Sequence, residues 1–94
     1  MRVMPDVDVL LKRAPQCMSC PFGAGVALLD LRTNVYFTVN TVGAAVWDLL
    51  ATPQSSGKIV EGICAIYDVP PQVAQRDVAA LLADLARRGL VEVV

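Results

Sequence analysis

Three cysteines are the residues of this chain whose types and spacing could most directly do chemistry. Cys17 and Cys20 have the spacing of half a zinc site or of a redox pair, and Cys64 stands alone. Zinc needs further ligands, and a redox pair needs a feature such as a helix N-terminus that lowers a thiol pKa. We therefore expect ordinary thiols and no metal or cofactor, with a small cysteine-based metal or redox protein as an alternative.

The remaining side chains do not assemble into a predicted catalytic site. Histidine, the commonest general base and a common metal ligand, does not occur in the sequence. Ser55 and Ser56 have no nearby base, and the carboxylates are scattered along the chain. The Gly23-Ala-Gly25 run precedes a predicted strand, whereas a nucleotide-binding loop follows one. The sequence thus predicts a protein that is not an enzyme.

Composition narrows the possible partners. The 94 residues are 55% apolar and 18% charged, with 8 basic and 9 acidic side chains, which fits a single domain over residues 1–94. The near-neutral balance predicts binding to neither nucleic acid nor membrane surfaces, and every long uncharged run is broken by proline and glycine. With no signal-peptide pattern and an odd number of cysteines, we expect a cytoplasmic protein.

Strand patterns dominate the first half of the chain. Apolar residues predict a short strand within 7–12, and the runs 26–31 and 35–39 predict a hairpin that turns near Asn34. Two prolines and two glycines within 14–25 predict a loop there.

Alternation within 35–39 separates its side chains between two faces of the sheet. Val35, Phe37 and Val39 share one face, and Tyr36 and Thr38 share the other. We expect Phe37 to point inward and Tyr36 to point outward, with the opposite register as the alternative.

Helical spacing follows in three segments. The first begins at Asn40 or Thr41 and ends near residue 51, the second begins at the serine pair 55–56, and the third runs from the proline pair 70–71 to Gly89. The residues 91–94 are expected to add a short strand. The apolar positions expected to face the core are Val42, Ala45, Val46, Leu49 and Leu50 in the first helix, Ile59, Val60, Ile63, Cys64 and Tyr67 in the second, and Val73, Val78, Leu81, Leu82 and Leu85 in the third. Trp47 is also expected to be packed.

This order predicts an α+β fold in which a three-stranded antiparallel sheet at the N-terminus is followed by three α-helices. If the first strand pairs with the second, strand 35–39 is an open edge. That strand has no charge, proline or lysine to block pairing with another chain. An open edge beside an apolar helix is suited to a peptide that binds as an added strand.

The run from Val26 to Leu50 resembles the PqqD-like family, and the resemblance extends over about Gly25 to Val91. Asn34 stands where glycine is usual in that family, and the Cys17–Cys20 segment lies outside its pattern. The matching positions are Leu29-Asp30, Tyr36-Phe37, Asn40, Gly43-Ala44, Trp47, Ile66-Tyr67-Asp68-Val69 and Asp77-Val78.

The resemblance implies a winged-helix-like domain that binds the leader of a ribosomally synthesised precursor peptide. It also implies a partner maturation enzyme, either a leader protease of lasso-peptide pathways or a radical SAM enzyme of pyrroloquinoline quinone synthesis. The leader would bind as a strand against 35–39, beside a wall formed by the third helix. The implied peptide-binding residues are Val35, Tyr36, Phe37, Thr38 and Val39 on the strand and Asp77, Val78, Leu81, Leu82 and Leu85 on the helix.

Other interpretations stay open at this point. A winged-helix DNA-binding or regulatory domain would need a basic recognition helix, and the second helix offers only Lys58 against Glu61. Asp77 is either a solvated charge near the start of a helix or an acceptor at the rim of a peptide groove. A homodimer that pairs through the open edge is compatible with peptide binding.

Overall fold

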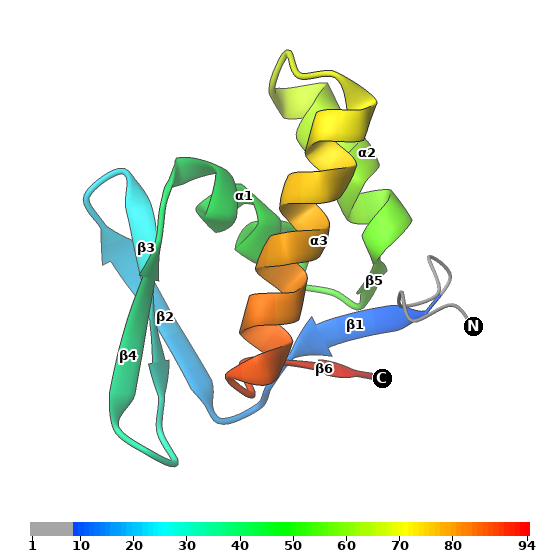
Figure 1. The fold of residues 1–94 in the computed structure, drawn as a ribbon. Helices are drawn as coiled ribbons and strands as arrows, with labels where there is room; N and C mark the ends of the chain where they lie inside the picture. Colours follow the sequence, from blue (N-terminus) through cyan, green and yellow to red (C-terminus); the bar gives the residue numbers. More distant parts are fainter. Residues whose placement is uncertain (1–8) are drawn as a thin grey trace.

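Nine short elements make up the part of the chain that the computed structural model describes, residues 9–94 (Figure 1). None of the helices in that part is both long and apolar enough to span a membrane. In chain order the elements are β1 (Leu10–Arg13), β2 (Cys17–Phe22), β3 (Gly25–Asp30), β4 (Val35–Val39), α1 (Thr41–Leu49), β5 (Gln54–Ser55), α2 (Ser56–Ile66), α3 (Pro71–Arg87) and β6 (Val91–Val93).

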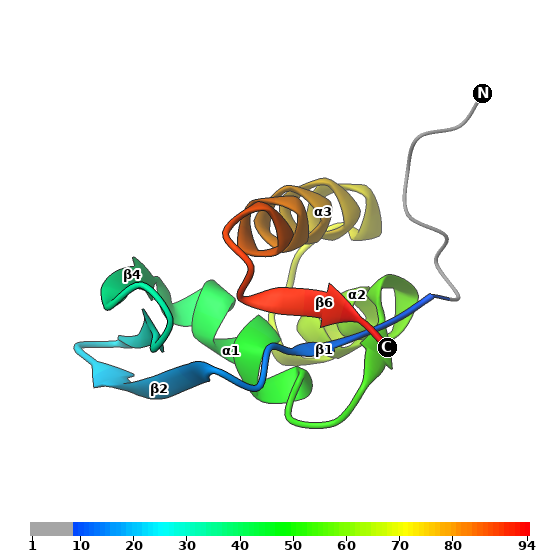
Figure 2. The same cartoon turned by 90° about the horizontal axis from the view of Figure 1, so that it is seen from below.

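The strands form two separate three-stranded sheets, with the orders β5-β1-β6 and β2-β3-β4. Helix α1 lies between the two sheets, and β4 is on the side of the molecule that carries α3 (Figures 1 and 2). The predicted α+β fold, a three-stranded antiparallel sheet followed by three helices, is confirmed. The strand composition of that sheet, however, differs from the prediction in two respects.

The first difference concerns β1, which does not pair with the hairpin strands. Leu11 is opposite Gln54 of β5 on one side and Val93 of β6 on the other. The expected strand at 91–94 is therefore confirmed, and it is the partner of β1. The predicted strand started at residue 7, and its first two residues lie outside the described part of the chain. The local sequence pattern indicates that a segment is extended, but it does not indicate which strand it pairs with. The pairing of β1 with β6 depends on the core that Leu11 and Val91 share.

The second difference is that half of the predicted loop 14–25, residues 17–22, is strand β2, which takes the place expected for the first strand. Pro21 is tolerated because β2 is an edge strand, where a residue without an N–H does not break a ladder. Gly23 has a φ of 59° in the tight turn that joins β2 to β3. Gly25 lies against β4, since a Cβ atom there would come within 1.9 Å of the Val39 carbonyl oxygen. The proline and glycine signals thus mark an edge strand and a hairpin turn.

The predicted hairpin is confirmed as β3 and β4, with its turn at Asn34. Leu28 is opposite Phe37, and Leu29 is opposite Tyr36. Asn34 adopts a left-handed conformation, with a φ of 60°, and its N–H donates to the Asp30 carbonyl oxygen at 2.8 Å. Asparagine is one of the few residues that accept this conformation readily, which explains why glycine is not required here.

Predicted caps fix the helix ends. The Asn40 side chain accepts a hydrogen bond from the Gly43 N–H at 2.9 Å, and Ser55 accepts from Lys58 N–H at 3.2 Å. Gly89 ends the third helical segment with a φ of 75°.

The helices enclose most of the core. Trp47 is 2% exposed, as expected for a packed residue. Val42 is 37% exposed, so its predicted place in the core is wrong. It lies in the first turn of α1, where the sheet and α3 do not cover it. The buried apolar residues are Leu11, Ala14, Leu28, Val46, Trp47, Leu50, Ile59, Ile63, Ala74, Val78, Leu82, Leu85, Leu90 and Val91.

A groove between strand β4 and helix α3

Strand β4 is the outer strand of its sheet, because β3 is its only pairing partner among the described residues. Its five side chains carry no charge, and Val35 and Tyr36 are largely exposed. The residues of an edge strand present alternate N–H and C=O groups to solvent. This edge is therefore free to add another strand.

A groove of about 410 Å³ lies between this edge and α3. Residues 37–40 form one wall, Val42 and Gly43 in the first turn of α1 form the end, and Asp77 and Leu81 of α3 form the opposite wall. The strand and helix walls implied by the resemblance therefore face each other across a real hollow.

The groove continues into an apolar pocket of about 140 Å³ between the three helices. Val42, Asp77 and Leu81 line both hollows, so the two are adjacent. Asp77 is the only charged residue of this lining. The other residues of the pocket are Val46, Ile63, Tyr67, Val69, Val73, Ala74 and Val78.

Close packing sets the distance between α1 and β4. A Cβ atom on Gly43 would lie 2.7 Å from the Val39 Cβ atom, so only glycine allows the first turn of α1 to approach the strand this closely. The Gly43-Ala44 motif in the sequence therefore positions the end wall of the groove.

Arg88 closes the other end of β4. Its guanidinium carbon lies 4.1 Å from the centroid of the Phe37 ring, and its Nε donates to Asp84 Oδ1 at 3.4 Å. Asp84 and Arg88 are four residues apart, the spacing that places two side chains on the same face of a helix. A hollow of about 220 Å³ lies here, lined by Asp30, Thr33, Val35, Phe37, Arg88 and Leu90. Phe37 thus takes part in two hollows that follow one another along β4.

The structure brings together most of the residues predicted for the site. Phe37 is half-buried and packs against the core, and Tyr36 is 69% exposed, which confirms the expected orientations. Thr38, Val39, Asp77 and Leu81 line the groove, and Val78 lines the pocket. Leu82 and Leu85 are buried, on the side of α3 that faces the core.

Several lining residues were not among the predicted site residues, and Val42, Val73 and Arg88 are three of them. The two valines were assigned to the core because helical spacing alone does not separate a core-facing valine from one that lines a groove. Arg88 has a sequence signal in its spacing from Asp84, but its contact with Phe37 depends on the tertiary fold.

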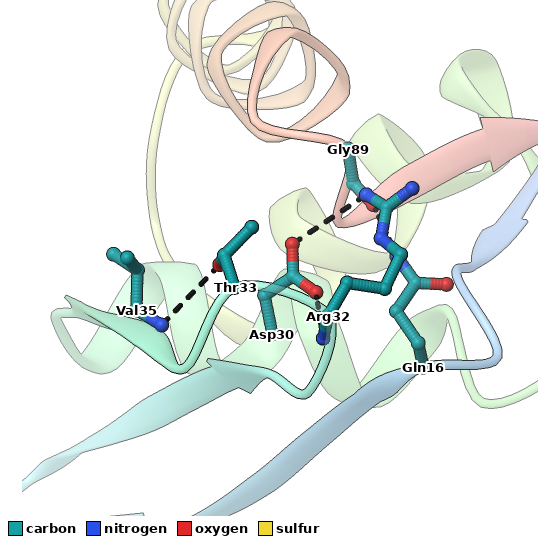
Figure 3. Close-up of polar contacts among 6 residues, drawn as sticks. All are labelled: Gln16, Asp30, Arg32, Thr33, Val35 and Gly89. Atoms are coloured by element: carbon teal, nitrogen blue, oxygen red, sulfur yellow. Dashed lines mark hydrogen bonds and ion pairs between the residues drawn. The ribbon is translucent and has the colours of Figure 1, made fainter.

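The turn at the Arg88 end of β4 is held by a buried carboxylate, Asp30 (Figure 3). Asp30 Oδ1 accepts a hydrogen bond from the Arg32 N–H at 2.9 Å, and the Arg32 guanidinium lies 3.5 Å from Oδ2. The backbone N–H of Arg32 contributes most to lowering the pKa of the Asp30 carboxyl, with its guanidinium adding to the effect. Gln16 Nε2 donates to the Gly89 carbonyl oxygen at 3.0 Å, which ties the start of β2 to the end of α3.

The three cysteines differ in exposure: Cys17 and Cys64 are partly buried, and Cys20 is exposed. Cys17 and Cys20 are three positions apart on β2, so their side chains point to opposite faces of the sheet. Burial raises the pKa of the Cys17 thiol, and the nearby Asp30 carboxylate raises it further. Across residues 9–94, no group of three or more cysteine, aspartate or glutamate side chains is placed to hold a metal ion.

Helix α2, the candidate recognition helix of the DNA-binding alternative, presents no basic surface. Its one lysine, Lys58, lies 3.7 Å from Glu61, and both side chains are exposed. The negative charge of Glu61 offsets the positive charge of Lys58, so the helix has little attraction for phosphate groups.

Comparison with solved structures gives two similar chains. One, described as "TbiB1 in Complex with the TbiA(beta) Leader Peptide", is 34% identical with a TM-score of 0.79, covering 86% of this chain and 94% of that chain. The other, "Lasso peptide synthetase B1 complexed with the leader peptide", is 25% identical with a TM-score of 0.74, covering 87% of this chain and 96% of that chain.

A comparison with functionally curated proteins gives no significant match. Residues 25–91 match the model of the family described as coenzyme PQQ synthesis protein D. The matched range begins at β3, ends at β6 and includes the whole groove. The chain therefore belongs to the coenzyme PQQ synthesis protein D (PqqD) family.

Proposed function

We propose that this chain is a non-catalytic protein that binds the leader of a ribosomally synthesised precursor peptide as an added strand on β4. Both similar solved structures are complexes with leader peptides. The single observation that carries the proposal is the open edge of β4, which lies beside a groove walled by α3. An extended peptide satisfies the free backbone groups of such an edge and places alternate side chains in the groove.

The two parts of the site have different tasks. Backbone hydrogen bonds along 35–39 hold any extended peptide, so they supply affinity with little dependence on sequence. The apolar pocket between the helices supplies selectivity, because it accepts an apolar side chain and excludes a charged one. We expect a high-nanomolar to micromolar dissociation constant, or roughly −8 to −10 kcal/mol.

Asp77 gives the groove its polar element. Its side chain is 62% exposed and lies 3.4 Å from Arg76 Nε, and it borders both the groove and the pocket. A carboxylate at this rim accepts hydrogen bonds from a basic or amide side chain of the leader, which fixes the position of the peptide along the groove.

Within residues 9–94, the lining of the groove contains no serine, cysteine or histidine, which supports a role in which another protein acts on the bound leader. We propose that the chain presents the leader to a maturation enzyme, either a leader protease or a radical SAM enzyme. The similarity to a protein described as lasso peptide synthetase B1 favours the leader protease. Pull-down of candidate enzymes with and without leader peptide would identify the partner.

Proline substitution on β4 tests strand addition. Phe37 and Thr38 are neighbours, so the N–H of one faces β3 and that of the other faces the open edge. Phe37→Pro and Thr38→Pro should both be made, and fluorescence polarisation with a labelled leader peptide measures affinity. The variant that loses the outward N–H should lose binding and keep its helices by circular dichroism.

Lys58→Ala, on the far helix α2, is the control and should bind as the unmodified chain does. Strand addition is wrong if both proline variants remain folded and bind the leader with unchanged affinity. If the unmodified chain binds no leader at all, the proposed function itself fails.

A further inference from the structure

A second apolar surface covers the face of the β2-β3-β4 sheet that points away from the core. It forms a hollow of about 360 Å³, and its lining contains no charged residue. Tyr36, Phe22 and Met18 are 69%, 60% and 57% exposed, respectively, which is unusual for side chains of this size. The lining residues are Met18, Ser19, Cys20, Phe22, Ala27, Leu29 and Tyr36. The groove beside α3 uses none of them.

The register of the sheet arranges part of this surface as a row. Met18 is opposite Leu29, and Leu29 is opposite Tyr36, so the three side chains stand in line across the three strands. Tyr36 is the last member of the row, because no further strand follows β4 in this sheet within residues 9–94. The apolar row therefore ends at the edge to which a peptide would be added.

An added strand continues the pleat of the sheet, so its side chains alternate between two faces. If two of its residues stand beside Val35 and Phe37, on the side of the sheet that faces α3, the residue between them stands on the outer face. Its Cβ atom lies about 4.5–5.5 Å from that of the directly opposite residue on β4. For one peptide position, that opposite residue is Tyr36.

We propose that the β4 edge of the outer face is the second half of the peptide site, and that Tyr36 selects an apolar or aromatic side chain at one alternate position of the bound peptide. This inference rests on the proposed leader binding. The exposed Tyr36 ring has Leu29 on the β3 side and solvent on the open side, so a peptide side chain opposite Tyr36 is sheltered by the ring and extends the row. A charged side chain at that position would lose hydration against a lining without any charge.

The apolar row and the binding edge share strand β4, so a peptide added to that edge extends the row. Met18 is two strands from the edge, at about 4.7–4.9 Å per strand, so a peptide side chain does not reach it. Tyr36 and Met18 are exposed residues of the same row, but only Tyr36 would contact the bound peptide.

The test measures binding of fluorescein-labelled leader peptides to the full chain by fluorescence polarisation. The probes are the TbiA(beta) leader peptide and the leader encoded in the precursor gene nearest to the gene of this chain. Tyr36→Ala should weaken binding roughly 3- to 5-fold, and Tyr36→Phe should bind as tightly as the unmodified chain. Met18→Ala is the matched control and should leave affinity unchanged. Thermal melts check that each variant remains folded.

Peptide variants locate the position that Tyr36 reads. Each leader residue is changed to aspartate in turn and tested against the unmodified chain and Tyr36→Ala. One position should be sensitive to aspartate in the unmodified chain and much less so in Tyr36→Ala, whereas the positions on either side should stay sensitive in both. Coupling to no position, or an equal effect of Met18→Ala, overturns the proposal.

Two further outcomes are distinguishable. If neither leader binds the unmodified chain, the proposed function fails and this inference fails with it. If leaders bind, but Tyr36→Ala changes only the monomer–dimer equilibrium in sedimentation, the outer face is an interface between copies of the chain and the inference alone is wrong.

Discussion

The guanidinium of Arg88 lies over the ring of Phe37, with 4.1 Å between the guanidinium carbon and the ring centroid. Arg88 is the C-cap residue that follows α3, and Phe37 is the central residue of β4. Asp84 holds the guanidinium from one turn back along the helix. The contact therefore connects the two walls of the groove through an arginine that is itself fixed to the helix.

Removal of this contact should loosen the groove. We expect Arg88→Ala to lower the free energy of unfolding by about 0.5–1 kcal/mol, the usual contribution of a partly exposed cation–π contact. It should weaken leader binding more than it changes stability, because the Phe37 ring loses its fixed position. Urea denaturation and fluorescence polarisation measure the two effects. Arg87→Ala is the control, since Arg87 also pairs with Asp84. If Arg87→Ala and Arg88→Ala lose stability and leader affinity equally, the effect comes from the positive charge at the helix end and not from the contact with Phe37.

The close approach of Gly43 to β4 predicts that alanine at this position destabilises the fold, although helix propensity alone would favour alanine. Alanine normally stabilises a helix relative to glycine by roughly 0.5–1 kcal/mol. At position 43 the added methyl group would lie 2.7 Å from the Val39 Cβ atom, which is held rigidly by the strand. We expect Gly43→Ala to destabilise the fold by about 1–3 kcal/mol, as measured by thermal or urea denaturation.

Gly62→Ala is the matched control for this substitution. There the added methyl group would meet the end of the Leu49 side chain at 2.8 Å, and that flexible end can rotate away. The control should therefore be neutral or stabilising. A Gly43→Ala variant as stable as the unmodified chain would show that α1 does not need to approach β4 this closely.

The rim carboxylate should contribute to affinity through charge. Asp77→Asn keeps the size of the side chain and removes its charge, and we expect the leader to bind roughly 3- to 10-fold more weakly. The difference should shrink as ionic strength rises, because Asp77 is exposed enough for salt to screen it. Titrations at low and high salt measure this. Asp48→Asn, on the exposed side of α1, should have no effect, and a salt-independent loss would contradict the charge argument.

Helices and the central hairpin could be predicted because their signals are local. Capping side chains, apolar spacing and the left-handed tolerance of Asn34 all act within a few residues. Strand β2 could not be predicted, because Pro21 and Gly23 are typical of loops. Only the structure shows that Pro21 lies on an edge strand and that Gly23 lies in the turn that follows it. The partners of β1 lie more than forty residues away, and only the tertiary fold chooses them.

The same division applies to the groove. The β4 wall follows from the alternation in 35–39, so the orientations of Tyr36 and Phe37 were predictable. The α3 wall was predicted only as a helix face. Leu81 and Leu82 are adjacent in sequence, yet one lines the groove and the other is buried, because the rotation of α3 is set by packing against α2 and the sheet.

The cysteine environments predict different reactivities. Cys20 is exposed on the outer face, whereas Cys17 is half-buried with a raised pKa. Under iodoacetamide at limiting concentration, Cys20 should be alkylated first and Cys17 slowly, because the thiolate is the reactive form. Peptide mass spectrometry reads the two sites separately. A rapid Cys17–Cys20 disulfide on mild oxidation would contradict their placement on opposite faces of β2.

The buried carboxylate of Asp30 predicts a specific pH dependence of stability. Its pKa is lower in the folded chain than in the unfolded chain, mainly because of the Arg32 N–H, so the folded state favours the ionised form. The stabilisation is therefore present above the ordinary aspartate pKa of about 4, and it is lost as the pH falls through the folded-state value. Asp30→Asn removes the charge, and the variant should be less stable than the unmodified chain at neutral pH. Urea denaturation at a series of pH values should show this difference shrinking in acid. A constant gap for Asp30→Asn across the series would mean that the carboxylate acts through its shape alone.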